Sequence, residues 1–143
     1  MSVKQLSVFA ENKSGSLCEV TSILSETKIN IRAFSVADTD KYGVIRMIVD
    51  DPRKAAYALS EAGKIVNVTD VVGVQITDET GGLDILLKTL AANGINVEYL
   101  YAFVSTADNA ADVVIRVSDN GATEKILTKA GYKLISDIDI GKK

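Results

Sequence analysis

The sequence predicts an α+β protein built from two ferredoxin-like βαββαβ repeats, each an antiparallel sheet with its helices on one face. Three observations support this prediction. The segment from Glu11 to Leu17 returns 66 residues later as the segment from Thr77 to Leu83, with a glycine and a leucine at matching places. An asparagine, Asn30 or Asn96, follows each copy at the same interval. Each half also shows the same order of strand-like and helix-like apolar patterns, which indicates a duplicated folding unit of ferredoxin-like type.

In the first half, residues 3–10 alternate loosely between apolar and polar types and predict a strand. A helix is expected to begin at Ser14-Gly15-Ser16, because small polar side chains can satisfy the free amides of a first helical turn. Apolar residues then follow at helical spacing through Leu24. The other elements are expected as strands over 30–37 and 44–49, a helix from Pro52 to Gly63, and a strand that starts at Ile65.

The second half repeats this order. A strand over 71–76 is expected to lead into a helix that starts near Leu83 and ends at Gly94. Strands over 96–104 and 112–117, a helix over 123–130 and a last strand over 132–140 complete it. No proline-rich or Gly-Ser linker separates the halves, so we expect two domains, residues 1–70 and 71–143, held by a short tether.

Composition excludes several classes of function. The chain has 143 residues, 47% of them apolar, and halves this small are expected to bury apolar surface against each other or in a homodimer. A net charge of −3 without a basic block argues against nucleic acid. No apolar run approaches the roughly 18 residues that span a bilayer, so no membrane partner is expected. The single Cys18 and a start without a secretory signal favour a cytoplasmic protein.

Catalytic and metal chemistry is not evident in the sequence. There is no histidine, and neither Cys18 nor the serines near it have a visible base partner. The carboxylates are scattered as in turns and solvated faces, and there is no Cys-x-x-Cys. We therefore predict no catalytic residue, no metal and no cofactor. Aromatics on one strand (Tyr99, Tyr101 and Phe103) would suit RNA stacking, but the first copy has only Phe34 there, so packing is the favoured role.

The repeated feature is a polar loop that runs into a helix start, followed by an asparagine at the head of the next strand. A helix start offers free amides to a carboxylate, and Gly15 or Gly81 lets a ligand approach the backbone. The carboxamide of Asn30 or Asn96 can bind a carboxylate or an ammonium. These groups suit a free α-amino acid. Each could also serve only as a helix cap or a strand-edge partner, and that interpretation stays open.

These two copies resemble the ACT domain, and the resemblance covers nearly the whole chain as a tandem pair. The pattern is an acidic residue or Asn, then Gly-x-Leu, a helix, and Ile-Asn followed by Ile or Val. The resemblance implies a regulatory module that binds amino acids at interfaces between paired domains. It implies two sets of ligand-binding residues: Asn12, Lys13, Ser14, Gly15, Ser16, Leu17, Asn30 and Ile31 in the first copy, and Asp78, Glu79, Thr80, Gly81, Gly82, Leu83, Asn96 and Val97 in the second.

The chain departs from the family pattern in two ways. Ser14 and Thr80 stand where the family often has proline before the glycine, and Asn12 stands where an aspartate is frequent. The change at Asn12 puts equal affinity of the two sites in doubt. In the second copy, Asp78 or Glu79 could pair with an ammonium.

The sequence therefore favours a non-catalytic regulatory sensor that binds a free amino acid at ACT-like domain interfaces and forms a homodimer. The alternative is a ligand-independent interaction subunit that associates with an enzyme of amino-acid metabolism. A catalytic role is the least supported hypothesis, because no triad or paired-carboxylate arrangement is visible.

Overall fold

The computed structural model describes residues 2–103 and 107–140. The chain forms two compact units, Lys4–Thr69 and Asp70–Lys143 with Met1–Val3. We call them the N-terminal unit and the C-terminal unit. The domain boundary between residues 70 and 71 stays a prediction.

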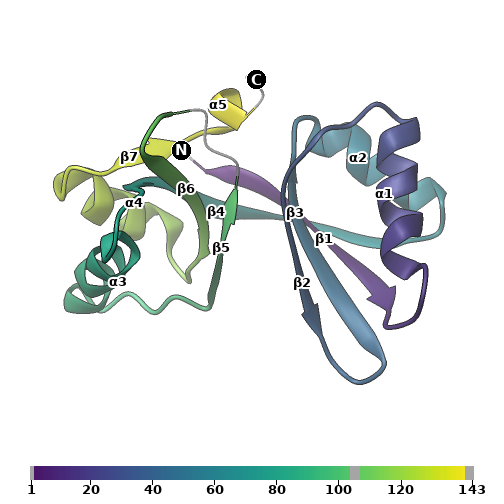
Figure 1. The fold of residues 1–143 in the computed structure, drawn as a ribbon, viewed down its shortest axis with the longest axis horizontal. Coiled ribbons are helices and arrows are strands. Elements are labelled where there is room, and N and C mark those ends of the chain that lie inside the picture. The colour runs from purple at the N-terminus through teal and green to yellow at the C-terminus, as the bar shows by residue number, and fades with distance from the viewer. Residues whose placement is uncertain (1, 104–106, 141–143) are drawn as a thin grey trace. The chain divides into compact units, whose positions relative to one another are not determined.

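The N-terminal unit is a four-stranded antiparallel sheet with two helices on one face (Figure 1). The strand order is β2-β3-β1-β4, and β3 pairs with both β1 and β2, with Val8 opposite Ile45. Its elements are β1 (Val3–Glu11), α1 (Ser16–Glu26), β2 (Ile31–Asp38), β3 (Tyr42–Val49), α2 (Pro52–Glu61) and the first part of β4 (Ile65–Thr77).

The C-terminal unit repeats this arrangement. Its strand order is β7-β4-β6-β5, and all three pairings are antiparallel. Besides the second part of β4, its elements are α3 (Gly82–Ala92), β5 (Tyr99–Phe103), β6 (Ala110–Arg116), α4 (Asn120–Lys129), β7 (Lys133–Ile135) and α5 (Asp137–Ile140). The predicted pair of ferredoxin-like βαββαβ repeats is thus confirmed.

Each unit has its own core between sheet and helices. Alternate strand residues point toward the helices and meet the apolar stripe of each helix. Leu24 of α1 and Leu90 of α3 occupy matching positions, and both are fully buried. The N-terminal core is Leu6, Val8, Val20, Leu24, Ile29, Ile45, Met47, Val49, Ala55 and Leu59; the C-terminal core is Val72, Val74, Ile76, Leu86, Leu90, Val113, Ile115, Val117 and Leu127.

The strand β4 is longer than the sequence predicts. Two strands were expected around Thr69-Asp70, whereas one strand of 13 residues runs from Ile65 to Thr77. Its residues are largely β-branched and contain no proline, so nothing in the local sequence breaks the extended backbone.

The end of the chain also differs from the prediction. The expected strand over 132–140 is reduced to β7, and the short helix α5 follows it. Ser136 and Asp139 explain the switch. The Ser136 amide donates to Asp139 Oδ2 (3.0 Å) and the Asp139 amide donates to Ser136 Oγ (3.4 Å), a reciprocal arrangement that starts a helix.

The strand β5 begins at Tyr99 rather than at Asn96, and the expected end at residue 104 lies outside the described residues. Tyr101 and Phe103 are buried. Their burial supports the packing role and removes them as a platform for stacking RNA bases.

Candidate functional site

The two predicted loops have the same backbone conformation. In the N-terminal unit, the Asn12 amide donates to the Lys41 carbonyl (2.8 Å). In the C-terminal unit, the Asp78 amide donates to the Asn109 carbonyl (2.9 Å). Gly15 and Gly81 each have a φ of 87°. Each loop is therefore fixed against the hairpin beside it, and each turns into its helix through a left-handed glycine.

These glycines are the N-caps of α1 and α3, and neither helix start is capped by a side chain. The expected capping by Ser14 and Ser16 does not occur. The first amide of each helix donates back to the loop, from Ser16 to the Lys13 carbonyl (3.3 Å) and from Gly82 to the Glu79 carbonyl (3.0 Å).

The next two amides of each helix have no acceptor among residues 2–103 and 107–140. They belong to Leu17 and Cys18 in α1, and to Leu83 and Asp84 in α3. Each pair of amides is an available donor set at a positive helix end.

The second helix of each unit is built differently. Asp51 caps α2, accepting from the Lys54 amide at 3.1 Å, and Asp119 caps α4, accepting from the Ala122 amide at 3.0 Å. The chain therefore uses ordinary carboxylate caps on α2 and α4 and leaves α1 and α3 open. An external carboxylate could supply the missing acceptor at either open start.

The two glycines at the open helix starts have open space where a side chain would begin. A Cβ built on Gly15 or on Gly81 would meet nothing within 4 Å. Gly82 is different, because a Cβ there would collide with the Thr77 carbonyl oxygen. The missing side chain of Gly81 thus leaves open space beside the loop, whereas the missing side chain of Gly82 allows the loop to pack tightly against the end of β4.

The two asparagines lie away from the loop of their own unit. Gly15 precedes α1 and Asn30 follows it, so they stand at opposite ends of an 11-residue helix about 16 Å long. Asn96 is related to Gly81 in the same way across α3. Neither unit alone brings its loop and its asparagine together, and the supply of the asparagine by a neighbouring domain stays a prediction.

Asn30 is held by its backbone. Its amide donates to Asp50 Oδ1 (3.1 Å), and its carbonyl accepts from the Asp50 amide (3.1 Å). The residue is half-buried, and its carboxamide has no hydrogen-bond partner in the described part of the chain. Ile31 begins β2 directly after it, while the exposed Asn96 and the half-buried Val97 lie in the irregular segment before β5. Asn30 is therefore the more firmly placed of the two.

The charges of the two loops differ although their backbones match. Asn12 Nδ2 donates to the Thr39 carbonyl (3.3 Å), and Lys13 Nζ pairs with Glu11 Oε2 (3.2 Å). The matching positions hold Asp78 and Glu79, both exposed. The N-terminal loop is thus the more favourable of the two for a carboxylate, and the C-terminal loop for an ammonium.

Two hollows lie beside the N-terminal loop, and another lies beside Asp108 and Asn109 in the C-terminal unit. One of about 110 Å³ lies between the N-terminal loop and the β2–β3 hairpin, with Leu17 and Val36 in its lining. A larger one of about 360 Å³ lies on the other side of this loop, toward the start of β4. A third, of about 430 Å³, lies at the matching place in the C-terminal unit.

The residues of the larger hollows were not predicted from the sequence. They come from strand ends and from the segment after the second helix. The missed residues are Phe9, Tyr42, Lys64 and Ile65 in the N-terminal unit and Gln75, Asn109, Tyr132 and Lys133 in the C-terminal unit. An alignment of the two halves pairs Phe9 with Gln75, Lys64 with Tyr132 and Ile65 with Lys133, but nothing in it distinguishes a hollow from a packed strand end.

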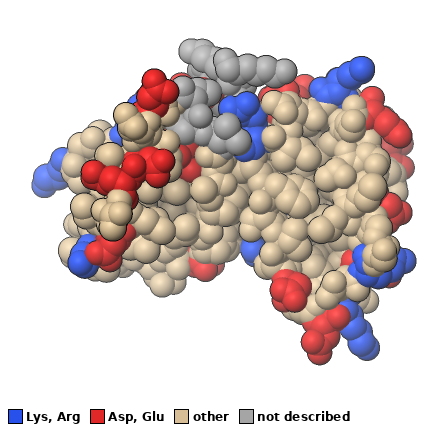
Figure 2. All heavy atoms as spheres, in the orientation of Figure 1, with Lys and Arg blue, Asp and Glu red and all other residues tan. Residues whose placement is uncertain are grey.

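The described residues contain no group of three or more His, Cys, Asp or Glu placed to hold a metal. Cys18 is free and exposed, with its Sγ 3.7 Å from Ser22 Oγ. On the face drawn in Figure 2, acidic and basic side chains are interspersed. None of the helices in the described ranges is long and apolar enough to cross a membrane.

A comparison with known protein families shows to which family the chain is related. The ACT domain pair family matches residues 1–142. The chain belongs to the ACT domain pair family. A crystallised protein of Bacteroides thetaiotaomicron is 40% identical to this ACT domain pair, with a TM-score of 0.92 over 100% of this chain and 98% of that one.

More distant solved structures share the fold. The ligand-free regulatory subunit of aspartate kinase from Thermus thermophilus is 18% identical, with a TM-score of 0.65 over 90% of this chain and 92% of that one. The corresponding subunit from Thermus flavus is 17% identical, with a TM-score of 0.60 over 89% and 91%. At these identities the likeness shows the fold alone. A comparison with curated proteins finds no match.

Proposed function

We propose that this ACT domain pair is a non-catalytic regulatory protein that binds a free amino acid. The observation that carries the proposal is the contrast between capped and open helix starts. α2 and α4 carry aspartate caps, whereas α1 and α3 begin at a left-handed glycine with no side-chain cap and with open space where its side chain would begin. The missing acceptor is supplied by the ligand carboxylate.

The ligand carboxylate accepts from the amides of Leu17 and Cys18 in the N-terminal unit, or from those of Leu83 and Asp84 in the C-terminal unit. A carboxylate at a helix start gains about 0.3–1 kcal/mol from the helix dipole, and charge-assisted hydrogen bonds add to it. This is a fraction of the roughly 4 kcal/mol that corresponds to millimolar binding. The ligand therefore requires further contacts.

Those contacts come from a neighbouring domain. The carboxamide of Asn30 or Asn96 meets the ligand's ammonium from the other side of an interface, and Asp78 adds a negative charge in the second copy. Because Asn30 lies a full helix length from Gly15, such a site needs a second module, and a homodimer provides one. A ligand that bridges two modules stabilises one arrangement of them, which is the physical basis of regulation.

The proposal includes the division at residue 70, a cytoplasmic location and the absence of any cofactor. The free, exposed thiol of Cys18 supports a reducing compartment. The proposed partner is an enzyme of amino-acid metabolism that responds to the ligand-bound arrangement of the modules.

Calorimetric titration of the full chain with each of the twenty amino acids tests the proposal. Binding of at least one of them at millimolar concentration or below is expected. The double variant Asn30→Ala with Asn96→Ala should lose it. Asn93→Ala is the matched control, because the Asn93 carboxamide already donates to the Thr89 carbonyl within α3 (2.8 Å). Equal loss in that control would contradict the assigned role of Asn30 and Asn96.

A ligand-independent interaction subunit is the second candidate. Apolar side chains at Leu17, Phe34 and Val36 are 37–42% exposed, which favours contact with another protein. An enzyme partner that co-purifies equally well with the chain and with the asparagine double variant, with no response to amino acids, would favour this candidate over the first.

A further inference from the structure

Each unit has a hollow at the same place, between the end of its first strand and the segment after its second helix. The N-terminal hollow measures about 360 Å³ and the C-terminal one about 430 Å³. Gly63 lies in the first and Gly131 in the second, with φ values of 83° and 91°. Both glycines end a helix through the same hydrogen bond, from Gly63 to the Ser60 carbonyl (3.0 Å) and from Gly131 to the Thr128 carbonyl (3.1 Å). The two units thus share the position of the hollow and the glycine turn at its edge.

The walls of the two hollows differ in chemistry. Phe9, Tyr42 and Ile65 line the N-terminal hollow, where they are 44%, 59% and 66% exposed. The matching positions in the C-terminal hollow are Gln75, Ala110 and Lys133. Large apolar side chains left open to water around a hollow are unfavourable unless something covers them.

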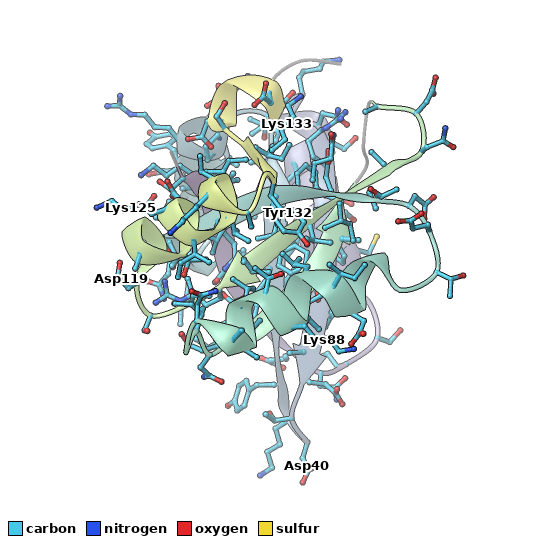
Figure 3. The ribbon with its side chains drawn as sticks, turned by 90° about the vertical axis from the view of Figure 1, so that its left-hand side faces the viewer. Asp40, Lys88, Asp119, Lys125, Tyr132 and Lys133 are labelled. Atoms are coloured by element: carbon cyan, nitrogen blue, oxygen red, sulfur yellow. The ribbon has the colours of Figure 1, made fainter. Side chains whose placement is uncertain are left out.

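Charged groups of both signs stand beside these apolar walls. Lys64 Nζ pairs with Glu19 Oε2 at 3.5 Å, which joins the segment after α2 to the first turn of α1. In the C-terminal unit, Tyr132 replaces Lys64; it lies with Lys133 where the chain passes from α4 into β7 (Figure 3). The N-terminal hollow therefore combines an apolar wall with balanced charge, which suits a zwitterion carrying an apolar group.

The volumes of the two hollows beside the N-terminal loop indicate which of them can hold a large side chain. Lys13 and Ser16 line both the hollow of about 110 Å³ toward β2 and the hollow of about 360 Å³ toward β4. Small-molecule sites usually measure about 300–1,000 Å³. Of these two hollows, the one toward β4 has the room for a bulky side chain beside the first turn of α1, where Ser16 and Glu19 line it.

We infer that the N-terminal unit takes an amino acid with a large aliphatic or aromatic side chain, which enters the hollow lined by Phe9, Tyr42 and Ile65. The inference rests on the proposed amino-acid binding and adds the ligand class. The carboxylate stays at the start of α1 and the side chain lies toward β4. The C-terminal hollow does not select such a side chain, because Gln75, Ala110 and Lys133 replace its apolar wall.

Calorimetry of the full chain with leucine, phenylalanine, alanine and glycine tests the inference. Burial of a large apolar side chain predicts that leucine or phenylalanine binds roughly 10-fold or more tightly than alanine. Phe9→Gln and Ile65→Lys give the N-terminal hollow the residues of the C-terminal one. Each should remove most of that preference and leave the affinity for alanine within about twofold.

Matched controls come from the other unit. Lys133→Ala alters the C-terminal hollow at an exposed position and should leave the leucine affinity unchanged. Phe9 and Ile65 are exposed, so their variants should keep the melting temperature within a few degrees of the parent. Amide chemical shifts should move at Gly63 and Ile65 when leucine is added.

The outcomes separate this inference from the proposed function. If no amino acid binds, both the proposed function and the inference are wrong. If an amino acid binds but alanine and leucine bind equally, or Phe9→Gln and Ile65→Lys change neither affinity, the inference is wrong and the proposed function stands. Shifts confined to Val36, Asp38 and Gly43 would place the ligand on the β2 side and also overturn the inference.

Discussion

Two neighbouring glycines in the C-terminal loop should resist substitution for different reasons. Gly81 has a φ of 87° and open space around its missing Cβ, so Gly81→Ala costs only backbone strain. A left-handed alanine is unfavourable by about 1–2 kcal/mol. Alanine also restricts the unfolded chain, which offsets this cost by about 0.4–1 kcal/mol. The net loss of unfolding free energy should be about 1 kcal/mol.

Gly82→Ala should cost more. A Cβ at this position would collide with the Thr77 carbonyl oxygen, which is backbone and cannot swing aside. The end of β4 or the first turn of α3 must shift, at a cost of about 2–3 kcal/mol. Urea unfolding of the full chain, followed by circular dichroism, measures both losses.

Gly81→Asn distinguishes backbone strain from a steric effect of the added side chain, because asparagine is larger than alanine but tolerates the left-handed region better. It should lose less stability than Gly81→Ala. The reasoning is refuted if Gly81→Asn costs as much as Gly81→Ala, or if Gly82→Ala is no more destabilising than Gly81→Ala.

Three further predictions concern the scaffold, and urea unfolding checks each of them. Asp51→Ala and Asp119→Ala each remove a helix cap and should each lower the unfolding free energy by about 1 kcal/mol; a loss in only one would contradict the equivalence of α2 and α4. Leu24→Ala and Leu90→Ala empty fully buried positions and should each cost about 2–5 kcal/mol, so a cost under 1 kcal/mol would show that the site is not packed as described. Lys88→Ala breaks an exposed pair with Asp84 (2.8 Å) and should change stability by no more than about 0.5 kcal/mol, a larger loss being inconsistent with a solvated pair.

The fold could be predicted because the repeat is visible in residues that shape the backbone. Gly15 and Gly81 both adopt the left-handed conformation, so their recurrence marks the same turn in each half. Leu24 and Leu90 recur because both fill a core. Local backbone requirements and apolar spacing are short-range properties, and the sequence displays them directly.

The end of the chain was predicted wrongly because a strand and a helix start compete there. Residues 132–140 have strand-forming character, but the reciprocal hydrogen bonds of Ser136 and Asp139 start a helix instead. The continuous β4 has a related origin. Thr69-Asp70 resembles a break in the sequence, yet pairing partners on both sides keep the strand extended.

The candidate site could be predicted only in part. The loops were placed at helix starts as expected, but Ser14 does not cap α1, and that absence is what leaves the amides available. Phe9 and Tyr42 escaped prediction because strand aromatics usually pack. Their place at a hollow depends on where β4 begins, which is a tertiary property.

Calorimetric titration of leucine into the full chain and into the Gly15→Val variant tests the central claim most directly. The account predicts measurable binding to the parent chain. It predicts loss of that binding in the variant, because a β-branched residue does not fit the left-handed conformation of Gly15 (φ 87°), so the turn must change and the amides of Leu17 and Cys18 must move. Binding of equal strength in a folded Gly15→Val chain would contradict the claim that the open start of α1 receives the ligand.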